Sequence, residues 1–366
     1  MKLYQMKQKF ILCKNSKAVK PLLSFYPVKF IIQDFYYDKM SNFSKIRNSA
    51  RLSIAPMMDW TDRHCRYFHR TFSKNILLYT EMVTSPALVQ GNATYLLEFD
   101  KSEHPLALQL GGSDPTELAR AAVMGASFGY DEINLNVGCP SDRVQSGIFG
   151  AILMKTPEIV ANCCKEMIDA VDIEVTVKCR IGVDQQDPNE TLPKFLECIS
   201  KVGVTRVIIH ARKAILSGLS PKQNRNVPPL NYELVYKMKE QFPNLHISLN
   251  GGIQSLNQAQ SHLENGIDGI MIGRAAYQKP GEVLPDVDRL IYNLPNREVS
   301  EKEIVKQMIP YIENQYQNGN KVSKITRHML GLFSGRPGAK GWRKVLSENA
   351  HSSGPEIVLQ ALSEVE

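Results

Sequence analysis

Residues 246–274 read HISLNGGIQSLNQAQSHLENGIDGIMIGR and contain one complete unit of the predicted fold. An apolar run at 246–250 ends in Asn-Gly-Gly, a stretch with helical spacing follows, and a second apolar run at 269–272 ends in Gly-Arg. A strand, a helix and a strand in this order are typical of a βαβ unit with parallel strands. The stretch therefore predicts a parallel sheet whose strands end in glycine and polar residues.

The same alternation extends back to Arg51. Eight short apolar or β-branched runs are separated by helical stretches, at residues 52–55, 77–80, 106–110, 132–136, 174–178, 206–210, 246–250 and 269–272. Eight strand–helix units close a (β/α)8 TIM barrel, whose active-site face is formed by the carboxyl ends of the strands. We therefore expect an α/β protein with a barrel over 51–295. Helical spacing without strand runs predicts a small helical domain over 300–366.

The composition is that of a globular protein, because 43% of the 366 residues are hydrophobic and 22% are charged. Disordered and fibrous classes are excluded. The seven cysteines contain no CxxC pair, so we expect reduced thiols, no structural metal and a cytoplasmic location.

The net charge of +7 is concentrated before the barrel. Residues 1–50 hold ten Lys or Arg and only two Asp, which leaves the remaining chain close to neutral. Nucleic-acid binding by the folded body must therefore depend on local clusters. Two clusters contain no acid, one from Arg212 to Arg225 and one from Lys321 to Lys344. They are either RNA-contacting surfaces or ordinary solvated faces.

Residues 1–50 are basic, aromatic and irregular, and their apolar stretches are too short for a membrane span or a signal peptide. We expect an extension outside the fold, or a chain whose true start is Met40. A basic arm that contacts RNA is the alternative, and the scarcity of Arg disfavours a transit peptide.

The last two predicted strands end in Asn250-Gly251-Gly252 and Gly273-Arg274. Loops at these places commonly bind phosphate, because glycines admit backbone N–H groups and a helix N-terminus with an arginine adds positive potential. A tight turn would explain either glycine pair alone. Two pairs at consecutive strand ends favour a ligand that carries a phosphate.

Gln109 and Lys178 stand at two further strand ends and could address the polar edge of a flavin ring, where a cation stabilises the reduced anionic form. FMN therefore fits better than a sugar phosphate. Lys178 could instead form an ion pair with Glu132 or Glu174, and His210 could be an ordinary packed histidine.

Cys139 lies in the loop Asn136-Val137-Gly138-Cys139-Pro140-Ser141, after the fourth predicted strand. Glycine and proline restrict such a loop, which would hold the thiol above the barrel. Free thiols have a pKa of about 8.5 and stay mostly protonated at neutral pH, so a positioned thiol can act as a general acid. We expect Cys163, Cys164 and Cys179 to be buried and structural.

Six segments together closely resemble the tRNA-dihydrouridine synthase family: APMMDWTD at 55–62, LQLGG at 108–112, NLNVGCPS at 134–141, VKCRIG at 177–182, HARKA at 210–214 and NGG at 250–252. The resemblance covers residues 51 to about 350. The stretch LSPKQNR at 219–225, followed by Pro228-Pro229-Leu230, is similar to the A-type subfamily. This implies uridines 20 and 20a of the tRNA D-loop as substrates.

The resemblance implies an NADPH-dependent flavin oxidoreductase, in which hydride passes from reduced FMN to C6 of uracil and Cys139 gives a proton to C5. It implies FMN contacts from Pro56, Met57, Met58, Gln109, Lys178, His210, Asn250, Gly251, Gly252, Gly273 and Arg274. It implies tRNA contacts from Asn136, Lys222, Arg225, Arg327, Arg336 and Arg343. No membrane and no obligate protein partner is expected.

Three other functions stay open. An FMN barrel acting on a free metabolite such as dihydroorotate would not need the two basic clusters. An RNA-binding protein or chaperone would leave the polar strand ends unused and would bind no yellow flavin. A sugar-phosphate aldolase would use Lys178 as a Schiff base, which borohydride would trap.

Overall fold

The computed structural model describes residues 43–141, 149–295 and 299–365. All of them belong to one compact unit of the chain, which begins at Asn42. The expectation for most of the N-terminal extension therefore lies outside the described residues. Within the described residues, no helix combines the length and the apolar composition that a membrane span requires.

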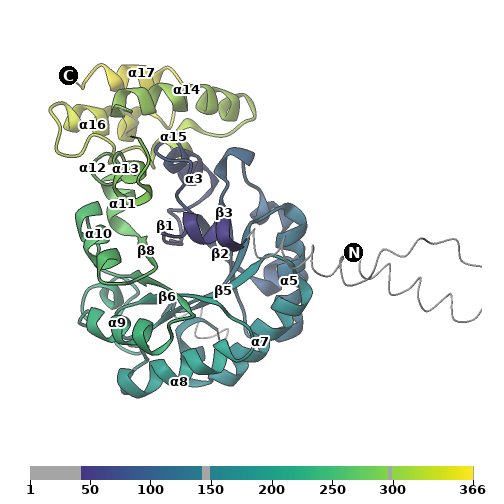
Figure 1. Cartoon of the computed structure of the whole chain (residues 1–366). Helices are drawn as coiled ribbons and strands as arrows, with labels where there is room; N and C mark the ends of the chain where they lie inside the picture. Colours follow the sequence, from purple (N-terminus) through teal and green to yellow (C-terminus); the bar gives the residue numbers. More distant parts are fainter. Residues whose placement is uncertain (1–42, 142–148, 296–298, 366) are drawn as a thin grey trace, which may run out of the picture. The chain divides into compact units, whose positions relative to one another are not determined.

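Eight parallel strands form a barrel, as the sequence predicts (Figure 1). They are β1 (Leu52–Ile54), β2 (Leu78–Thr84), β3 (Leu106–Gly111), β4 (Glu132–Val137), β5 (Glu174–Arg180), β6 (Arg206–His210), β7 (His246–Asn250) and β8 (Gly269–Ile272). Each strand from β2 to β7 pairs with the next, and β1 pairs with β8. A parallel bridge between Ser53 and Leu77, with Ile54 N donating to Leu77 O at 3.0 Å, closes the ring beside β2.

Helices alternate with the strands, and several begin at a residue whose side chain caps the helix. They are α3 (Arg63–Arg70), α4 (Ser85–Val89), α5 (Pro115–Phe128), α7 (Pro157–Ala170), α8 (Pro188–Ser200), α9 (Tyr232–Gln241), α10 (Leu256–Glu264), α11 (Arg274–Gln278), α12 (Pro280–Val283) and α13 (Val287–Tyr292), with 3-10 turns η2 (Thr94–Leu97), η3 (Lys101–Glu103), η4 (Gly150–Lys155) and η5 (Gln223–Arg225). Asp114 and Asp187 cap α5 and α8, each followed by proline at the first helical position. These are favourable start signals, because the cap accepts from an otherwise free N–H and proline lacks one.

The strands alternate between two environments. On β4, Ile133, Leu135 and Val137 point outward into the apolar layer beneath the helices. Glu132 and Asn134 point inward and are completely buried, with hydrogen bonds to side chains of neighbouring strands. Because strand side chains alternate with a period of two, each strand delivers apolar groups to the helices and polar groups to the barrel interior.

The amino-terminal end of the barrel interior holds a buried charge network. Arg206 pairs with both Glu132 and Glu174, and its Nε lies 3.2 Å from a carboxylate oxygen of Glu174. The same glutamate accepts from Arg47 at 3.0 Å. Buried ions are tolerated only when they are paired and hydrogen-bonded. The two glutamates at this end of the barrel are therefore neutralised by arginines and are not available to a ligand.

The barrel takes in residues before Arg51, where the sequence pattern begins. Residues 43–49 are helical, and the side chains of Ile46 and Ala50 are buried against the barrel interior. Arg47 adds its ion pair to Glu174 across 127 positions of the sequence. The folded unit therefore starts several residues earlier than the expected boundary.

The C-terminal helices α14 (Glu301–Gln317), α15 (Val322–Thr326), α16 (Ala339–Asn349) and α17 (Ile357–Leu362) pack around buried Trp342. They also contact α3 directly. Tyr311 stacks on Tyr67 with ring centroids 3.8 Å apart and bonds to His64 at 2.8 Å. The C-terminal helices therefore belong to the same compact unit as the barrel and pack on the loop region after β1.

Candidate active site

Polar side chains from five strand ends meet at the carboxyl end of the barrel. The pairing register sets Gln109 beside Asn134, Asn136 beside Lys178, and His210 between Arg180 and Asn250. Parallel strands bring their carboxyl ends to one edge, so residues distant in sequence share one mouth. The structure thus brings together the predicted residues of β3 to β7.

Five basic residues at this mouth make no ion pair with any described carboxylate. They are Lys178, Arg180, Arg212, Arg225 and Arg274. Three of the arginines donate to backbone carbonyls or an amide: Arg180 to Gly138 O at 2.9 Å, Arg274 to Asn226 Oδ1 at 2.7 Å, and Arg212 to Pro228 O. The charges therefore remain uncompensated, and the site favours an anion.

Lys178 does not form the ion pair that its spacing allowed. Glu132 and Glu174 bond to Arg206 instead, and no described side chain pairs with Lys178. Burial, followed by the neighbouring Arg180, lowers the pKa of Lys178 to about 8. A partly desolvated ammonium without a counter-ion is a favourable receptor for negative charge.

His210 is buried at the end of β6, and burial together with the surrounding cations holds its pKa well below the usual value. The largest Coulombic effects come from Arg180 and Lys178. The ring is therefore neutral at pH 7, and it can donate or accept one hydrogen bond without adding charge.

The Asn250-Gly251-Gly252 segment requires both glycines. Gly251 and Gly252 have φ angles of 110° and 74°, which other residues rarely adopt. A Cβ on Gly251 would lie 2.5 Å from Cδ2 of His210, and a Cβ on Gly252 would lie 2.6 Å from Leu230. Because neither position can carry a side chain, the turn presents its bare backbone at this part of the mouth.

Gly273 differs from this pair. A Cβ there would only touch Ala55 and Met57, at 3.5 and 3.6 Å, and its φ of −107° is open to other residues. The space around Gly273 therefore leaves room for a Cβ at this position. The sequence suggests another reason for glycine here, namely that a ligand would approach the backbone of this residue closely.

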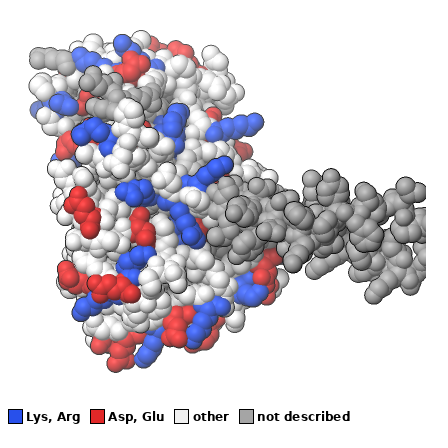
Figure 2. Space-filling model, viewed as in Figure 1, with Lys and Arg blue, Asp and Glu red and all other residues white. Residues whose placement is uncertain are grey.

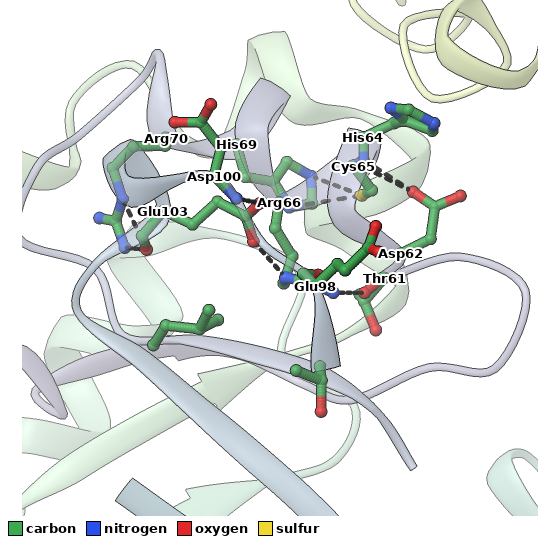
Figure 3. A network of polar contacts seen from close by, with 12 residues as sticks. Thr61, Asp62, His64, Cys65, Arg66, His69, Arg70, Glu98, Asp100 and Glu103 are labelled. Carbon is green, nitrogen blue, oxygen red and sulfur yellow. Dashed lines mark hydrogen bonds and ion pairs between the residues drawn. The ribbon is translucent and has the colours of Figure 1, made fainter. Parts of the chain in front are cut away.

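The loop after β1, which carries Pro56, Met57 and Met58, is fixed from α3. Met57 N donates to Thr61 Oγ1 at 2.9 Å, and Arg66 donates to Thr61 O at 2.9 Å. Figure 3 shows Arg66 reaching from α3 to Glu103, whose carboxylate lies 2.5 Å from its Nε. Met58 is left 56% exposed beside this rigid turn.

Cys139 occupies the loop between β4 and η4, with its side chain half-buried. Its N–H and that of Gly138 both donate to Asn136 Oδ1, each at 3.0 Å. Its thiol lies 3.5 Å from Ser141 Oγ. Arg180 donates to the carbonyl of Gly138 at 2.9 Å, and Lys178 lies in register beside Asn136. The loop of Cys139 therefore borders the cationic mouth.

Three further cysteines fit structural roles. Cys163 and Cys164 are buried on α7, and Cys179 is buried on the outward side of β5. Burial raises the pKa of Cys164 above its ordinary range and that of Cys179 to about 12, so both stay protonated thiols. Their expected burial is confirmed.

The residues expected to contact tRNA differ in how free they are. Lys222, Arg225 and Arg343 are exposed. Arg327 donates to Asp59 O at 3.1 Å, and Arg336 pairs with Glu301 at 2.8 Å. Lys and Arg predominate over the upper and central part of the face in Figure 2, whereas both signs alternate along its lower edge.

Sequence reasoning missed Thr176, which lies inside the barrel between Glu132 and Asn134. Its hydroxyl accepts from Asn134 Nδ2 at 2.8 Å and donates to Glu132 Oε1 at 2.5 Å. The available signal was its position two residues before Lys178, which puts both side chains on one face of β5. Arg180, two residues after Lys178, follows the same period.

This geometry defines a class: a (β/α)8 barrel enzyme with a cationic, glycine-lined anion site and a thiol at its mouth. A family model described as dihydrouridine synthase (Dus) matches residues 53–366. The chain belongs to this family, whose members are flavin-dependent enzymes.

Curated relatives named tRNA-dihydrouridine(20/20a) synthase match most of the chain. The Escherichia coli protein is 56% identical over 310 residues, which cover 84% of this chain and 89% of the relative. The Shewanella oneidensis protein is 54% identical over 324 residues, 88% and 96% of the two chains. The Vibrio vulnificus protein is 53% identical over 321 residues, 87% and 98%.

Proposed function

We propose that this chain reduces uridine to 5,6-dihydrouridine at positions 20 and 20a in the D-loop of tRNA. The observation that carries the proposal is the half-buried thiol of Cys139, held by two N–H bonds to Asn136 at a mouth lined by unpaired cations. The names of the relatives point to the same reaction. A thiol in this place can donate a proton to a substrate that lies over the barrel.

The residues at the mouth fit FMN. Arg212 Nε is buried without a hydrogen-bond partner among the described residues, and the turn at Gly251 leaves no room for a side chain. A phosphate group would satisfy the free donors of Arg212 and Arg274. The flavin ring would lie near Gln109, Lys178 and the β1 loop. The full set of proposed contacts is Pro56, Met57, Met58, Gln109, Lys178, His210, Asn250, Gly251, Gly252, Gly273 and Arg274.

The chain's own groups then act on the uracil. Bound FMN, with NADPH as reductant, would supply the hydride to C6. Negative charge develops at C5 and O4, and Lys178 can stabilise it because its ammonium has no other counter-charge among the described residues. The thiol of Cys139 gives its proton to C5, which completes the reduction, and the thiolate is afterwards reprotonated from solvent.

tRNA binding is proposed for Asn136, Lys222, Arg225, Arg327, Arg336 and Arg343. A base can reach the mouth only after leaving its stack, which costs less in a loop than in a helix. Local basic residues on the segment after β6 and on α16 would hold the backbone while the base enters.

Mass analysis of D-loop fragments, after purified protein is incubated with unmodified tRNA and NADPH, tests the proposal. We expect a gain of about two mass units at the target uridines. Cys139→Ala should keep its flavin absorbance and NADPH oxidation but lose this gain by about 10²- to 10⁴-fold, the usual effect of removing a general acid. Absence of the mass gain with wild-type, flavin-loaded protein would refute the function.

A further inference from the structure

A chain of hydrogen bonds runs through the barrel from the buried charge network to the loop of Cys139. Glu132 Oε1 accepts from Thr176 at 2.5 Å, and Thr176 accepts from Asn134 at 2.8 Å. Asn134 Oδ1 accepts from Gln109 Nε2 at 2.8 Å, and Gln109 Oε1 accepts from Asn136 Nδ2 at 2.8 Å. Three adjacent strands, β3, β4 and β5, supply all five side chains.

The upper end of this chain has a fixed polarity. The N–H groups of Gly138 and Cys139 both point at the side chain of Asn136, and only its oxygen can accept from them. The amide nitrogen of Asn136 must therefore face Gln109, whose oxygen accepts. A flip of the Asn136 amide would set its NH2 group against two backbone donors.

The lower end fixes the same polarity independently. Glu132 accepts from Tyr79 at 2.9 Å and from Arg206, which holds its carboxylate as an acceptor. Thr176 therefore directs its proton to Glu132 and offers its oxygen to Asn134. Asn134 must then donate its NH2 group to Thr176 and accept from Gln109, and Gln109 must accept from Asn136. These are the same amide directions that the N–H groups of Gly138 and Cys139 require at the upper end.

We propose that Thr176 and Asn134 are positioning residues for Cys139, and that they act by fixing the amide orientations of Gln109 and Asn136. The side chains of Thr176, Asn134 and Gln109 are buried, so water does not compete for their bonds. Neither Thr176 nor Asn134 needs to touch tRNA or cofactor. The inference rests on the proposed function, because it concerns the delivery of the proton by Cys139.

Thr176→Val tests this directly, because valine keeps the shape of threonine and removes only the hydroxyl. Asn134 then loses its acceptor, and the Gln109 and Asn136 amides lose one of the two constraints on their direction. We expect kcat for dihydrouridine formation to fall about 10- to 100-fold, the effect of a misplacement near 1 Å. KM for tRNA, bound flavin and NADPH oxidation should remain near wild type.

Thr176→Ser supplies the matched control, because it restores the hydroxyl and should recover most of kcat. Ser248→Ala removes a different buried hydroxyl of the barrel interior, one with no hydrogen-bond partner in the part of the chain that the structure describes, and should leave kcat, KM and bound flavin unchanged. Alkylation by iodoacetamide, followed peptide by peptide, should become faster at Cys139 in Thr176→Val. The half-buried Cys198 on α8 serves as the internal reference.

The outcomes separate this inference from the function itself. Wild-type kcat in Thr176→Val, or equal losses in Thr176→Val and Thr176→Ser, would overturn the positioning role. In both cases dihydrouridine formation by the unaltered chain would still stand. If Thr176→Val does not fold, Asn134→Leu breaks the next link, and unchanged kcat in that variant overturns the role equally.

Discussion

Replacement of Lys178 by methionine should make the flavin-free protein more stable while weakening its flavin site. The ammonium is buried at the mouth without a described counter-ion, and burial lowers its pKa from 10.5 to about 8. At about 1.4 kcal/mol per pH unit, this depression corresponds to about 3 kcal/mol against the folded state at pH 7. Access of water at the open mouth reduces the gain expected from Lys178→Met to about 1–3 kcal/mol.

The pH dependence has a definite sign. Below pH 8 the lysine is charged in both states, so the folded protein carries the whole burial cost. Between about pH 8 and 10.5 the unfolded state binds more protons than the folded state, and the stability of the wild-type protein rises with pH. The advantage of Lys178→Met should therefore shrink by roughly half at pH 9.5.

Urea denaturation of the flavin-free proteins, followed by fluorescence at pH 7 and pH 9.5, measures both effects. Lys178→Arg should show no such change with pH, because arginine does not lose its proton. Lys194→Met removes a solvent-exposed lysine on α8 and should alter the free energy of unfolding by no more than about 0.5 kcal/mol. A loss of stability in Lys178→Met at pH 7 would refute the reasoning, because it would mean that the ammonium already has a stabilising partner.

Three further predictions concern tRNA binding and the edges of the fold. Arg343→Ala should raise KM for tRNA and flatten the slope of log binding constant against log salt concentration by up to about one unit. Arg336→Ala should have a smaller effect, because the guanidinium of Arg336 already pairs with Glu301. Equal effects of the two substitutions would contradict this ranking. His328→Ala should lower the free energy of unfolding by about 1–3 kcal/mol in urea titrations, because it breaks bonds to Asp62 and Tyr277, both at 3.1 Å; an unchanged midpoint would contradict it. Deletion of residues 1–39 should leave soluble, flavin-bound protein. Deletion of residues 1–50 should lower the free energy of unfolding by about 3 kcal/mol or more, because it removes buried Ile46 and the Arg47 ion pair. Equal thermal stability of the two truncated proteins would contradict this prediction.

The sequence predicted the barrel because each strand carries a local signal. The runs at 206–210, 246–250 and 269–272 match their strands residue for residue, since apolar runs bounded by polar or glycine residues determine where pairing begins and ends. The strand-end polar residues were found by the same signal. β2 and β5 extend beyond their predicted ends. On β2, pairing with β3 resumes at Met82 after an irregularity and continues to Thr84, and on β5 pairing with β6 includes Arg180.

Contacts between distant segments could not be predicted in the same way. Nothing local indicates that Arg336 pairs with a glutamate 35 positions away, or that Arg47 reaches Glu174 across the barrel. Thr176 gave no signal of its own, because threonine is common in strands. Its role depends on which side chains the neighbouring strands place beside it.

The separation of charge along the barrel explains how a body of nearly zero net charge can receive an anion. Glu132 and Glu174 lie at the amino-terminal end, where Arg206 and Arg47 bind them. At the opposite end, Lys178, Arg180, Arg212, Arg225 and Arg274 pair with no described carboxylate, so their charges are not cancelled by an ion pair. The attraction between a buried, unpaired cation and an anion is strong because the dielectric constant around it is low. Salt screens this attraction far less than it screens charges on the surface. Net charge is therefore a poor guide to this site. The length of the barrel separates Glu132 and Glu174 from the cations at the mouth, which leaves these cations available to a ligand.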